Sequence, residues 1–348
     1  MLSGDNGVLQ RATDAKTKSD EAQIRERIQL AYHSALTGGK GSYTKESLED
    51  ELENEFGENN YSVDDSDNAN WILSAQGQNV TIPAGEKIEK KTAILQGKEF
   101  WQGGNLFKTY GAVWSNIIGI IHSNEKPSDE NMSESHLWST NNSPNDVYFW
   151  LDASNKLYWW SEANNIKLNS DCTQMFSGWS NLNDISGLSN FDASEVENMN
   201  MMFCQSSISN LNSIKNWNTS NVKNMSQVFA GCNSLTSVTE IKDWDVSNVE
   251  NMYIMFSNCA ELTDIDLSQW NTNKVTNMEQ MFQGSRKLTT IYASNKFTTT
   301  SVTNSTSMFY GCTSLVGGSS TIYDSSKVDK TYAHIDGGVS NPGYFTAK

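Results

Sequence analysis

The sequence predicts an α/β fold, a leucine-rich-repeat-like solenoid of about six 26–27-residue repeats, preceded by an N-terminal helix and a small mixed α/β region. Three periodic features carry this prediction. A Met-Phe-like pair recurs at Met175-Phe176, Met202-Phe203, Val228-Phe229, Met255-Phe256, Met281-Phe282 and Met308-Phe309. An aromatic column (Phe191, Trp217, Trp244, Trp270, Phe297) and an asparagine column (Asn198, Asn224, Asn251, Asn277, Asn304) keep the same period. Periods of about 20 to 29 residues are typical of this architecture.

Within one repeat the pattern predicts a short helix, a turn and a strand. Val222, Met225 and Phe229 share one face of a helix that Ser220 would cap. The segment 231–233 (Gly-Cys-Asn) breaks that pattern, and 235–241 returns as an extended segment. Stacked repeats would then form a continuous parallel sheet with helices behind it. The Asn column is expected to bond to backbone groups of its own turn or of the neighbouring repeat.

The chain divides into five predicted regions. They are a helical segment (1–57), a small Trp-rich mixed α/β region (58–146), a hairpin that caps the first repeat (147–170), the repeats (171–318) and a C-terminal cap (319–348). Helices are expected over 8–36 and 44–56, and an acidic loop over 59–70. Strands are expected over 80–82, 92–95, 112–114 and 117–121, and the hairpin pairs 147–151 with 157–160.

The composition argues against several classes of partner. With 41 acidic and 25 basic residues the net charge is −16, which disfavours nucleic acid and anionic membrane surfaces. Abundant Asn, Ser and Thr with only 19% charged residues favour a protein that faces the outside of a cell. No apolar stretch in the sequence reaches the length of a membrane span.

The cysteines and acidic residues do not predict a cofactor or a metal site. Cys232, Cys259 and Cys312 occupy one slot of the repeat and are interpreted as core thiols; a Cys232–Cys259 disulfide is the alternative. Asp64, Asp65 and Asp67 lack the spacing of a known calcium loop, so a solvated acidic loop is favoured over a cation site.

No catalytic residues are predicted. The four histidines lie in four separate segments, and the carboxylates of the repeats form no pair that predicts acid/base chemistry. The sequence therefore predicts a protein that is not an enzyme.

Two sets of residues are candidates for binding. Alternation in the extended segments places an exposed sheet face at Thr236, Ser237, Thr239, Thr263, Asp264, Asp266, Thr289 and Thr290. Seven of the 11 tryptophans lie between Trp71 and Trp160, and Trp150, Trp159 and Trp160 form a candidate aromatic platform for a glycan. Packing of a core is the competing explanation for these tryptophans. Because neighbouring strand residues point to opposite faces, at most one of Trp159 and Trp160 should be buried.

The repeat 217–235, WNTSNVKNMSQVFAGCNSL, resembles that of the BspA-like leucine-rich-repeat surface proteins of bacteria. The resemblance covers about residues 147–345 and includes the lead-in 157–163 and the closing segment 331–345. It implies an extracellular, cell-surface protein for adhesion or recognition, whose partner is a protein or glycan of a host or neighbouring cell.

The first residues resemble another family. Residues 2–9, LSGDNGVL, followed by Ala12, Ala15, Lys16 and Ala22, look like the stretch after the membrane helix of type IV pilin-like proteins. That resemblance implies an apolar helix upstream of Met1, a membrane link only through that helix, and self-assembly through the N-terminal helix. A pilin-like or pseudopilin-like structural subunit is therefore the alternative function, and a glycan-active enzyme in the Trp-rich region is a third.

Overall fold

The computed structural model describes residues 20–35, 45–57, 60–66, 70–83, 91–100, 102, 104–111 and 113–348. Backbone contacts divide the chain into two units, 1–89 and 90–348, and the boundary falls inside the predicted 58–146 region. The other predicted limits, at 57, 146, 170 and 318, stay predictions.

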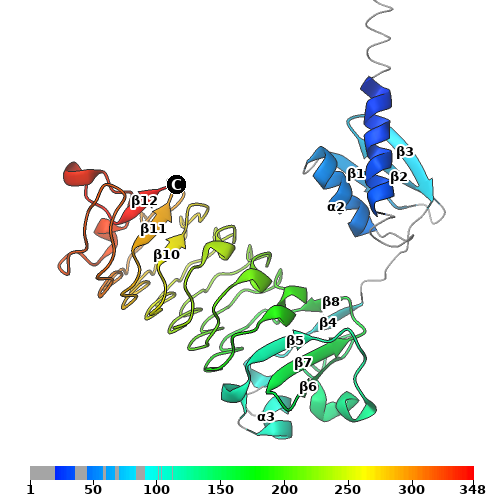
Figure 1. Cartoon of the computed structure of the whole chain (residues 1–348), viewed down its shortest axis with the longest axis horizontal. Coiled ribbons are helices and arrows are strands. Elements are labelled where there is room, and N and C mark those ends of the chain that lie inside the picture. Colours follow the sequence, from blue (N-terminus) through cyan, green and yellow to red (C-terminus); the bar gives the residue numbers. More distant parts are fainter. Residues whose placement is uncertain are drawn as a thin grey trace, which may run out of the picture. The chain divides into compact units, whose positions relative to one another are not determined.

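The first unit combines helices with an antiparallel sheet (Figure 1). It holds a helix over 20–35, α2 (Lys45–Phe56) and the sheet β1–β2–β3 (Tyr61–Asp64, Asn70–Ala75, Gln78–Pro83). Leu48, Leu52 and Phe56 of α2 are buried at the predicted helical spacing, and Gly57 ends the helix with φ 81°. The predicted second helix is thus confirmed. Residues 8–19 and 36 of the first predicted helix lie outside the described residues.

One segment of the first unit differs from the prediction. Residues 61–64, expected in an acidic loop, form β1 and pair antiparallel with β2. Val63 is buried while its neighbours Ser62 and Asp64 are exposed, so this short strand has one apolar face. A single buried residue between polar ones is too weak a pattern to predict a strand.

The second unit opens with two small sheets and several short helices. Its helices are α3 (Asn105–Tyr110) and the 3-10 helices η1 (Lys98–Phe100), η2 (Trp114–Asn116), η3 (Asp129–Met132) and η4 (Glu134–His136). The sheets are β4–β8–β9 (Thr92–Ile94, Asn165–Lys167, Phe191–Asp192) and β5–β7–β6 (Gly119–His122, Lys156–Ser161, Val147–Leu151). The predicted hairpin is confirmed as β6 and β7, whereas Trp114 begins η2 and not the strand predicted over 112–114.

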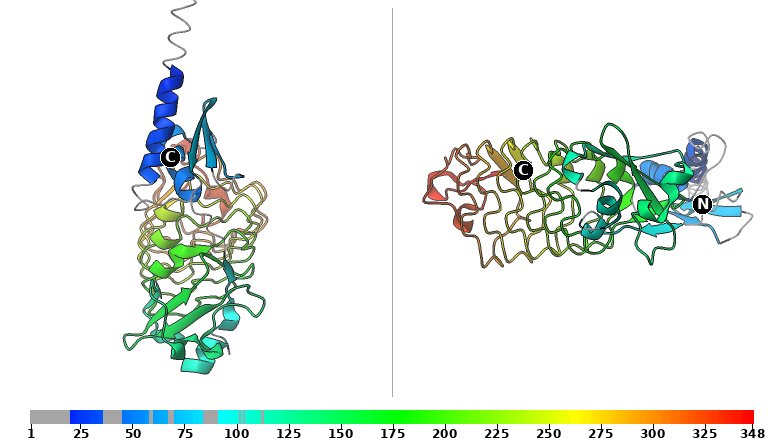
Figure 2. Two further views of the ribbon diagram at one scale, coloured as in Figure 1. Left: turned by 90° about the vertical axis from the view of Figure 1, so that its right-hand side faces the viewer. Right: turned by 90° about the horizontal axis from the view of Figure 1, so that it is seen from below.

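The repeats lie side by side and are joined by parallel backbone bridges (Figures 1 and 2). The asparagine column forms those bridges, Asn198 with Asn224, Asn224 with Asn251, and so on to Asn304. The Oδ1 of Asn251 accepts a hydrogen bond from the Tyr253 N–H at 3.0 Å, and each other member accepts one from the residue two positions on. The predicted structural role of this column is confirmed.

The predicted fold class, a leucine-rich-repeat-like solenoid, is wrong. Residues 171–318, all of them described, contain no α-helix. Their strands β9, β10 (Asp264–Asp266) and β11 (Thr290–Ala293) belong to two separate three-stranded sheets, so they form no continuous parallel sheet. The rest of the region consists of turns and the 3-10 helices η5 (Ser186–Asn190), η6 (Asn212–Ile214) and η7 (Thr239–Ile241).

The backbone explains why the helical spacing misled the prediction. Gln227 lies inside the predicted helix with φ 58°, and a left-handed residue cannot continue a right-handed helix. The corresponding position is left-handed in all six repeats (Gln174, Met201, Gln227, Ile254, Gln280, Ser307). The N–H groups of Gln227 and Phe229 donate to Tyr253 and Met255 of the next repeat at 2.8 and 3.1 Å. The apolar residues are buried as expected, but their backbone bonds run between repeats.

Stacked side chains fill the interior of the repeats. The six phenylalanines of the Met-Phe pairs form a column in which adjacent rings lie 5.4 to 6.1 Å apart and nearly parallel. Beside it, the indole N–H of Trp244 donates to the Ile214 carbonyl at 3.0 Å, as Trp217 and Trp270 do to Leu188 and Ile241. One apolar core runs from Ala93 to Phe345.

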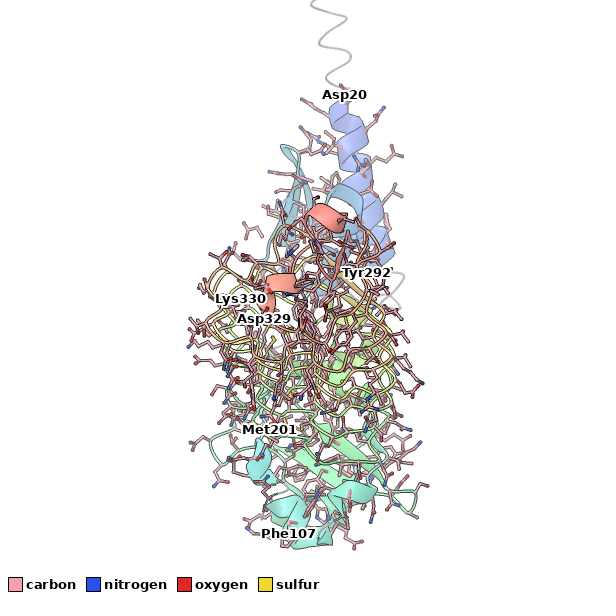
Figure 3. The ribbon with its side chains drawn as sticks, turned by 90° about the vertical axis from the view of Figure 1, so that its left-hand side faces the viewer. Asp20, Phe107, Met201, Tyr292, Asp329 and Lys330 are labelled. Atoms are coloured by element: carbon pink, nitrogen blue, oxygen red, sulfur yellow. The ribbon has the colours of Figure 1, made fainter. Side chains whose placement is uncertain are left out.

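The C-terminal residues close the last repeat. Strand β12 (Phe345–Ala347) pairs parallel with β11, after the 3-10 helices η8 (Lys330–Tyr332) and η9 (Gly338–Ser340). Asp329 caps η8 by accepting from the Thr331 N–H, and the Lys330 ammonium donates to the Val302 carbonyl (Figure 3). Among the described residues no helix has the length and apolar character required to span a membrane.

Candidate binding surfaces

Six of the eight residues predicted on an exposed sheet face form one surface, the hydroxyl ladder: Thr236, Ser237, Thr263, Asp264, Thr289 and Thr290. The exposed Thr263 donates from its N–H and its Oγ1 to the Thr236 carbonyl at 3.0 and 3.1 Å. Thr289 donates in the same way to Thr263, at 2.9 Å for both bonds. The ladder is therefore held in register over three repeats.

Asp264 occupies the centre of the ladder. Its backbone pairs with Ser237 on one side and with Thr290 on the other. Its carboxylate accepts a hydrogen bond from the Ser237 hydroxyl at 3.1 Å. The Thr263 hydroxyl is equally close, at 3.1 Å, and shares its one proton between this carboxylate and the Thr236 carbonyl. A carboxylate flanked by hydroxyl groups can accept hydrogen bonds from a partner.

The other two predicted residues do not lie on this surface. Thr239 is half-buried in η7, where its N–H donates to the Ser237 hydroxyl. Asp266 is only 1% exposed, and accepts from the Lys348 ammonium at 2.6 Å and the Ser268 N–H at 3.0 Å. Burial alone would raise the pKa of Asp266, but these two donors lower it. Alternation along the strand did not foresee that the C-terminal lysine would cover this carboxylate.

The predicted aromatic platform needs a correction. Trp159 is 1% exposed and faces the core, where its indole N–H donates to the Gly187 carbonyl at 3.2 Å. Trp150 and Trp160 point to the opposite face of the hairpin and are half-buried. Strand alternation explains the split, and the expectation that at most one of Trp159 and Trp160 is buried is confirmed.

Two tyrosines share the outer face with those tryptophans. Across the hairpin Tyr148 pairs with Trp160, and Trp150 pairs with Tyr158. The rings of Trp150 and Tyr158 are stacked, with centroids 5.7 Å apart and planes 13° apart. We call Tyr148, Trp150, Tyr158 and Trp160 the aromatic face. Sequence reasoning counted tryptophans only, although the same alternation already placed both tyrosines on this face.

A cavity of about 300 Å³ adjoins the aromatic face. Tyr148, Trp160, Asp146, Glu162 and Asn145 contribute to its wall, with Met132 and Pro144. The Tyr148 hydroxyl donates to the Asp146 carboxylate at 3.0 Å. Burial, this hydrogen bond and the charges of Asp146 and Glu162 raise the pKa of Tyr148.

A larger cavity, of about 560 Å³, lies near α3 and is lined mainly by amide side chains. Several of those amides already bond within the protein. Asn105 donates to the carbonyls of Glu134 and Leu137 at 3.0 and 2.8 Å, and Gln96 donates to Ser139 at 2.8 Å. These bonds give the amides a structural role.

The five cysteines are free, buried thiols. Burial raises the pKa of Cys232 to about 12, and its thiol donates to the Phe203 carbonyl at 3.2 Å. Cys259 and Cys312 donate in the same way to Phe229 and Phe282. A thiol that stays protonated is a poor nucleophile, so these residues act as core side chains.

Within the described part of the chain, no group of three His, Cys, Asp or Glu side chains is arranged to hold a metal ion. Of the acidic loop residues, Asp64 accepts from the Ser66 N–H at 3.0 Å, and Asp65 pairs with Lys45 at 3.0 Å. Asp67 lies outside the described residues.

The repeats are similar to one known family. The model of that family, described as "Mycoplasma protein of unknown function, DUF285", matches residues 170–293 and 236–340. The matched region includes the hydroxyl ladder and spans slightly less than half of the chain. It begins at residue 170, after the aromatic face. No curated protein and no solved structure matches the chain.

Proposed function

We propose that this protein is a non-enzymatic cell-surface protein for adhesion or recognition, and that the hydroxyl ladder is the surface that contacts its partner. The register of the ladder carries the proposal. Thr236, Thr263 and Thr289 come from three successive repeats, and backbone bonds fix each one against the next. A surface ordered before binding loses less conformational entropy when a partner docks.

The chemistry of the ladder suits a polar partner. The hydroxyl groups of Thr263 and Thr289 donate within the ladder and keep lone pairs that can accept hydrogen bonds from a partner, and Asp264 adds an acceptor with a negative charge. Protein and glycan surfaces both offer matching groups. The resemblance to BspA-like surface proteins and the weakly charged, Asn-, Ser- and Thr-rich composition support an extracellular location.

The test is a binding screen of the full chain against glycan and extracellular-matrix protein arrays. The informative variant is Thr263→Lys, and Thr276→Lys is its matched control. Both threonines are exposed, and each hydroxyl donates at 3.1 Å to a carbonyl of the preceding repeat. Thr276, however, lies beside the asparagine column and outside the ladder.

Thr263→Lys should weaken binding to a ligand found on the array about tenfold or more, because a long cation would project into the contact. Thr276→Lys should leave binding unchanged. Equal loss in both variants, or no ligand for the wild-type chain, would contradict the proposal.

A second function has one observation in its favour. The cavity beside Trp160 holds two carboxylates, those of Asp146 and Glu162, and glycosidases use a carboxylate pair at the scissile bond. If the protein were such an enzyme, it would release reducing sugar from a glycan and Glu162→Gln would abolish that release.

The pilin-like alternative rests on residues 2–22, of which only 20–22 are described, and it stays a prediction.

A further inference from the structure

The cavity beside the aromatic face combines two rings with two carboxylates. Tyr148 and Trp160 are cross-strand partners on β6 and β7, so the strand pairing fixes the spacing of their rings. Asp146 directly precedes β6 and Glu162 directly follows β7. The same two strands therefore bring all four side chains to one wall.

The wall is negatively charged. Asp146 and Glu162 contribute carboxylates, and no lysine or arginine lines the cavity. Burial is the largest cause of the raised pKa of the Tyr148 hydroxyl, followed by its hydrogen bond to Asp146. The negative charges of Asp146 and Glu162 raise this pKa further. The chain as a whole carries −16. A cation entering the cavity is attracted both by the wall and by the whole protein.

The Trp160 ring already interacts with a cation. The Lys126 ammonium lies 5.8 Å from its centroid, within the range of a cation–π contact. Lys126 itself is exposed and is not part of the cavity wall. The indole can thus pair with an ammonium group, and a ligand cation would compete with the exposed Lys126 side chain for this ring. Aromatic rings are a setting in which proteins recognise alkylated ammonium ions.

We propose that the cavity formed by Tyr148, Trp160, Asp146 and Glu162 binds the alkylammonium group of a ligand. The inference rests on the proposed recognition function and names a chemical class for one of its ligands. The volume of about 300 Å³ lies at the small end of the range for ligand sites, so it suits a single head group better than an oligosaccharide.

The test is calorimetric titration of the full chain with choline, methylamine and 3,3-dimethylbutan-1-ol. The last compound has the shape of choline without its charge. Choline or methylamine should bind, and the uncharged compound should bind about tenfold more weakly than choline, since cation–π and carboxylate attraction are absent. Preference for choline identifies a quaternary ammonium ligand, whereas preference for methylamine identifies a primary amine such as a lysine side chain.

Variants assign the binding to the cavity. Trp160→Leu and Glu162→Gln should each reduce the affinity about fivefold. Trp150→Leu is the matched control, because Trp150 lies on the same face and stacks on Tyr158 but does not line the cavity. Thr263→Lys should leave choline binding unchanged, so a failure of the hydroxyl ladder is distinguishable from a failure of the cavity.

Three results would overturn the inference: no binding of either amine to a folded chain, equal binding of the uncharged compound, or equal effects of Trp150→Leu and Trp160→Leu. N-acetylglucosamine serves as a competitor. If this sugar binds in a Trp160-dependent manner and the amines do not, the cavity is a glycan site and the alkylammonium assignment is wrong.

Discussion

Aromatic side chains are used differently in the repeats and in the sheet that precedes them. Within the repeats, the six column phenylalanines and Trp179, Trp217, Trp244 and Trp270 are all buried. In the β5–β7–β6 sheet, Phe149 and Trp159 are buried as well, but the four residues of the aromatic face are only half-buried on the outside. Large rings that stay partly exposed to water contribute less free energy of burial than rings in the core. Core packing therefore does not explain why four aromatic residues lie on this face.

The outer surface of the repeats differs from the aromatic face in its composition. Its exposed positions carry mainly Thr, Ser, Asn and charged residues, with Tyr310 and Val316 as exceptions. Several of the polar side chains bond to the neighbouring repeat. Lys223 pairs with Glu197 at 2.8 Å and Lys287 with Glu261 at 2.6 Å, each bridging two repeats. The comparison suggests that broad polar contacts belong to the repeats and that a compact ligand belongs to the leading sheet.

The sharpest test of this comparison is truncation of one ring from each region. Phe256→Ala should destabilise the protein by about 3–5 kcal/mol, because it leaves a cavity between the rings of Phe229 and Phe282. Trp150→Ala should cost only about 1 kcal/mol. Urea denaturation measures both, and similar losses would show that the aromatic face is packed as tightly as the repeats.

The C-terminal cap tests whether the repeats depend on closure of their end. The Asp336 carboxylate accepts from the N–H groups of Ser319, Thr321 and Gly338 at 2.8 to 3.0 Å. Asp336→Asn should cost about 2–3 kcal/mol because these are charge-assisted bonds. Urea denaturation of the variant at pH 7 checks this value, and a loss below 0.5 kcal/mol would show that the cap is dispensable.

The same carboxylate predicts a pH dependence. Burial would raise the pKa of Asp336, but the donors from Thr321, Gly338 and Ser319 hold it far below its ordinary value. A depressed carboxyl pKa stabilises the fold above the unfolded pKa of about 4, and that contribution is lost as the pH falls below 4. The stability difference between wild type and Asp336→Asn should therefore shrink from pH 7 to pH 3. A stability difference between the two proteins that grows on acidification would contradict this prediction.

Variants in the asparagine column test how much the polar side chains of the repeats contribute to stability. Asn251→Ala removes the acceptor of the Tyr253 N–H and should cost about 1 kcal/mol. Asn233→Ala, at an exposed turn position of the neighbouring repeat, should change stability by less than about 0.5 kcal/mol. Thermal denaturation of the two variants resolves this difference, and equal values would mean that the column adds no stability.

The smallest expected effect is a gain. Ile254 is β-branched at φ 58°, a conformation that asparagine tolerates much better. Ile254→Asn should therefore stabilise the protein by about 0.5 kcal/mol. Gln280→Asn, at the equivalent position with φ 56°, should gain less because glutamine is not β-branched. A clear loss in Ile254→Asn would show that its half-buried side chain outweighs the backbone strain.

The sequence predicted the period, the buried columns, α2 and the β6–β7 hairpin, because each depends on local spacing of apolar residues. It did not predict the fold class. Residue identity does not reveal that Gln227 or Ile254 is left-handed, since neither is a residue that favours positive φ. The burial of Asp266 depends on Lys348, which is 82 residues away in the chain.

The candidate sites could likewise be predicted only in part from the sequence. The sequence placed Thr263 and Asp264 on the exposed face because they lie between apolar positions of the extended segment. The backbone register then added their partners in the adjacent repeats. The predicted hairpin already places Asp146 and Glu162 at its open end. The cavity could not be predicted, because its wall also needs Met132 of η3, whose position beside the hairpin depends on tertiary packing.

The central claim is that the cavity beside the aromatic face, and not the surface of the repeats, binds a compact cationic ligand. Two-dimensional NMR of the isotope-labelled full chain during a choline titration tests it most directly. We predict that the Trp160 indole signal and the amides of Tyr148 and Glu162 shift together, while the repeats stay unchanged. Shifts centred on the repeats, or none at saturating choline, would contradict the claim.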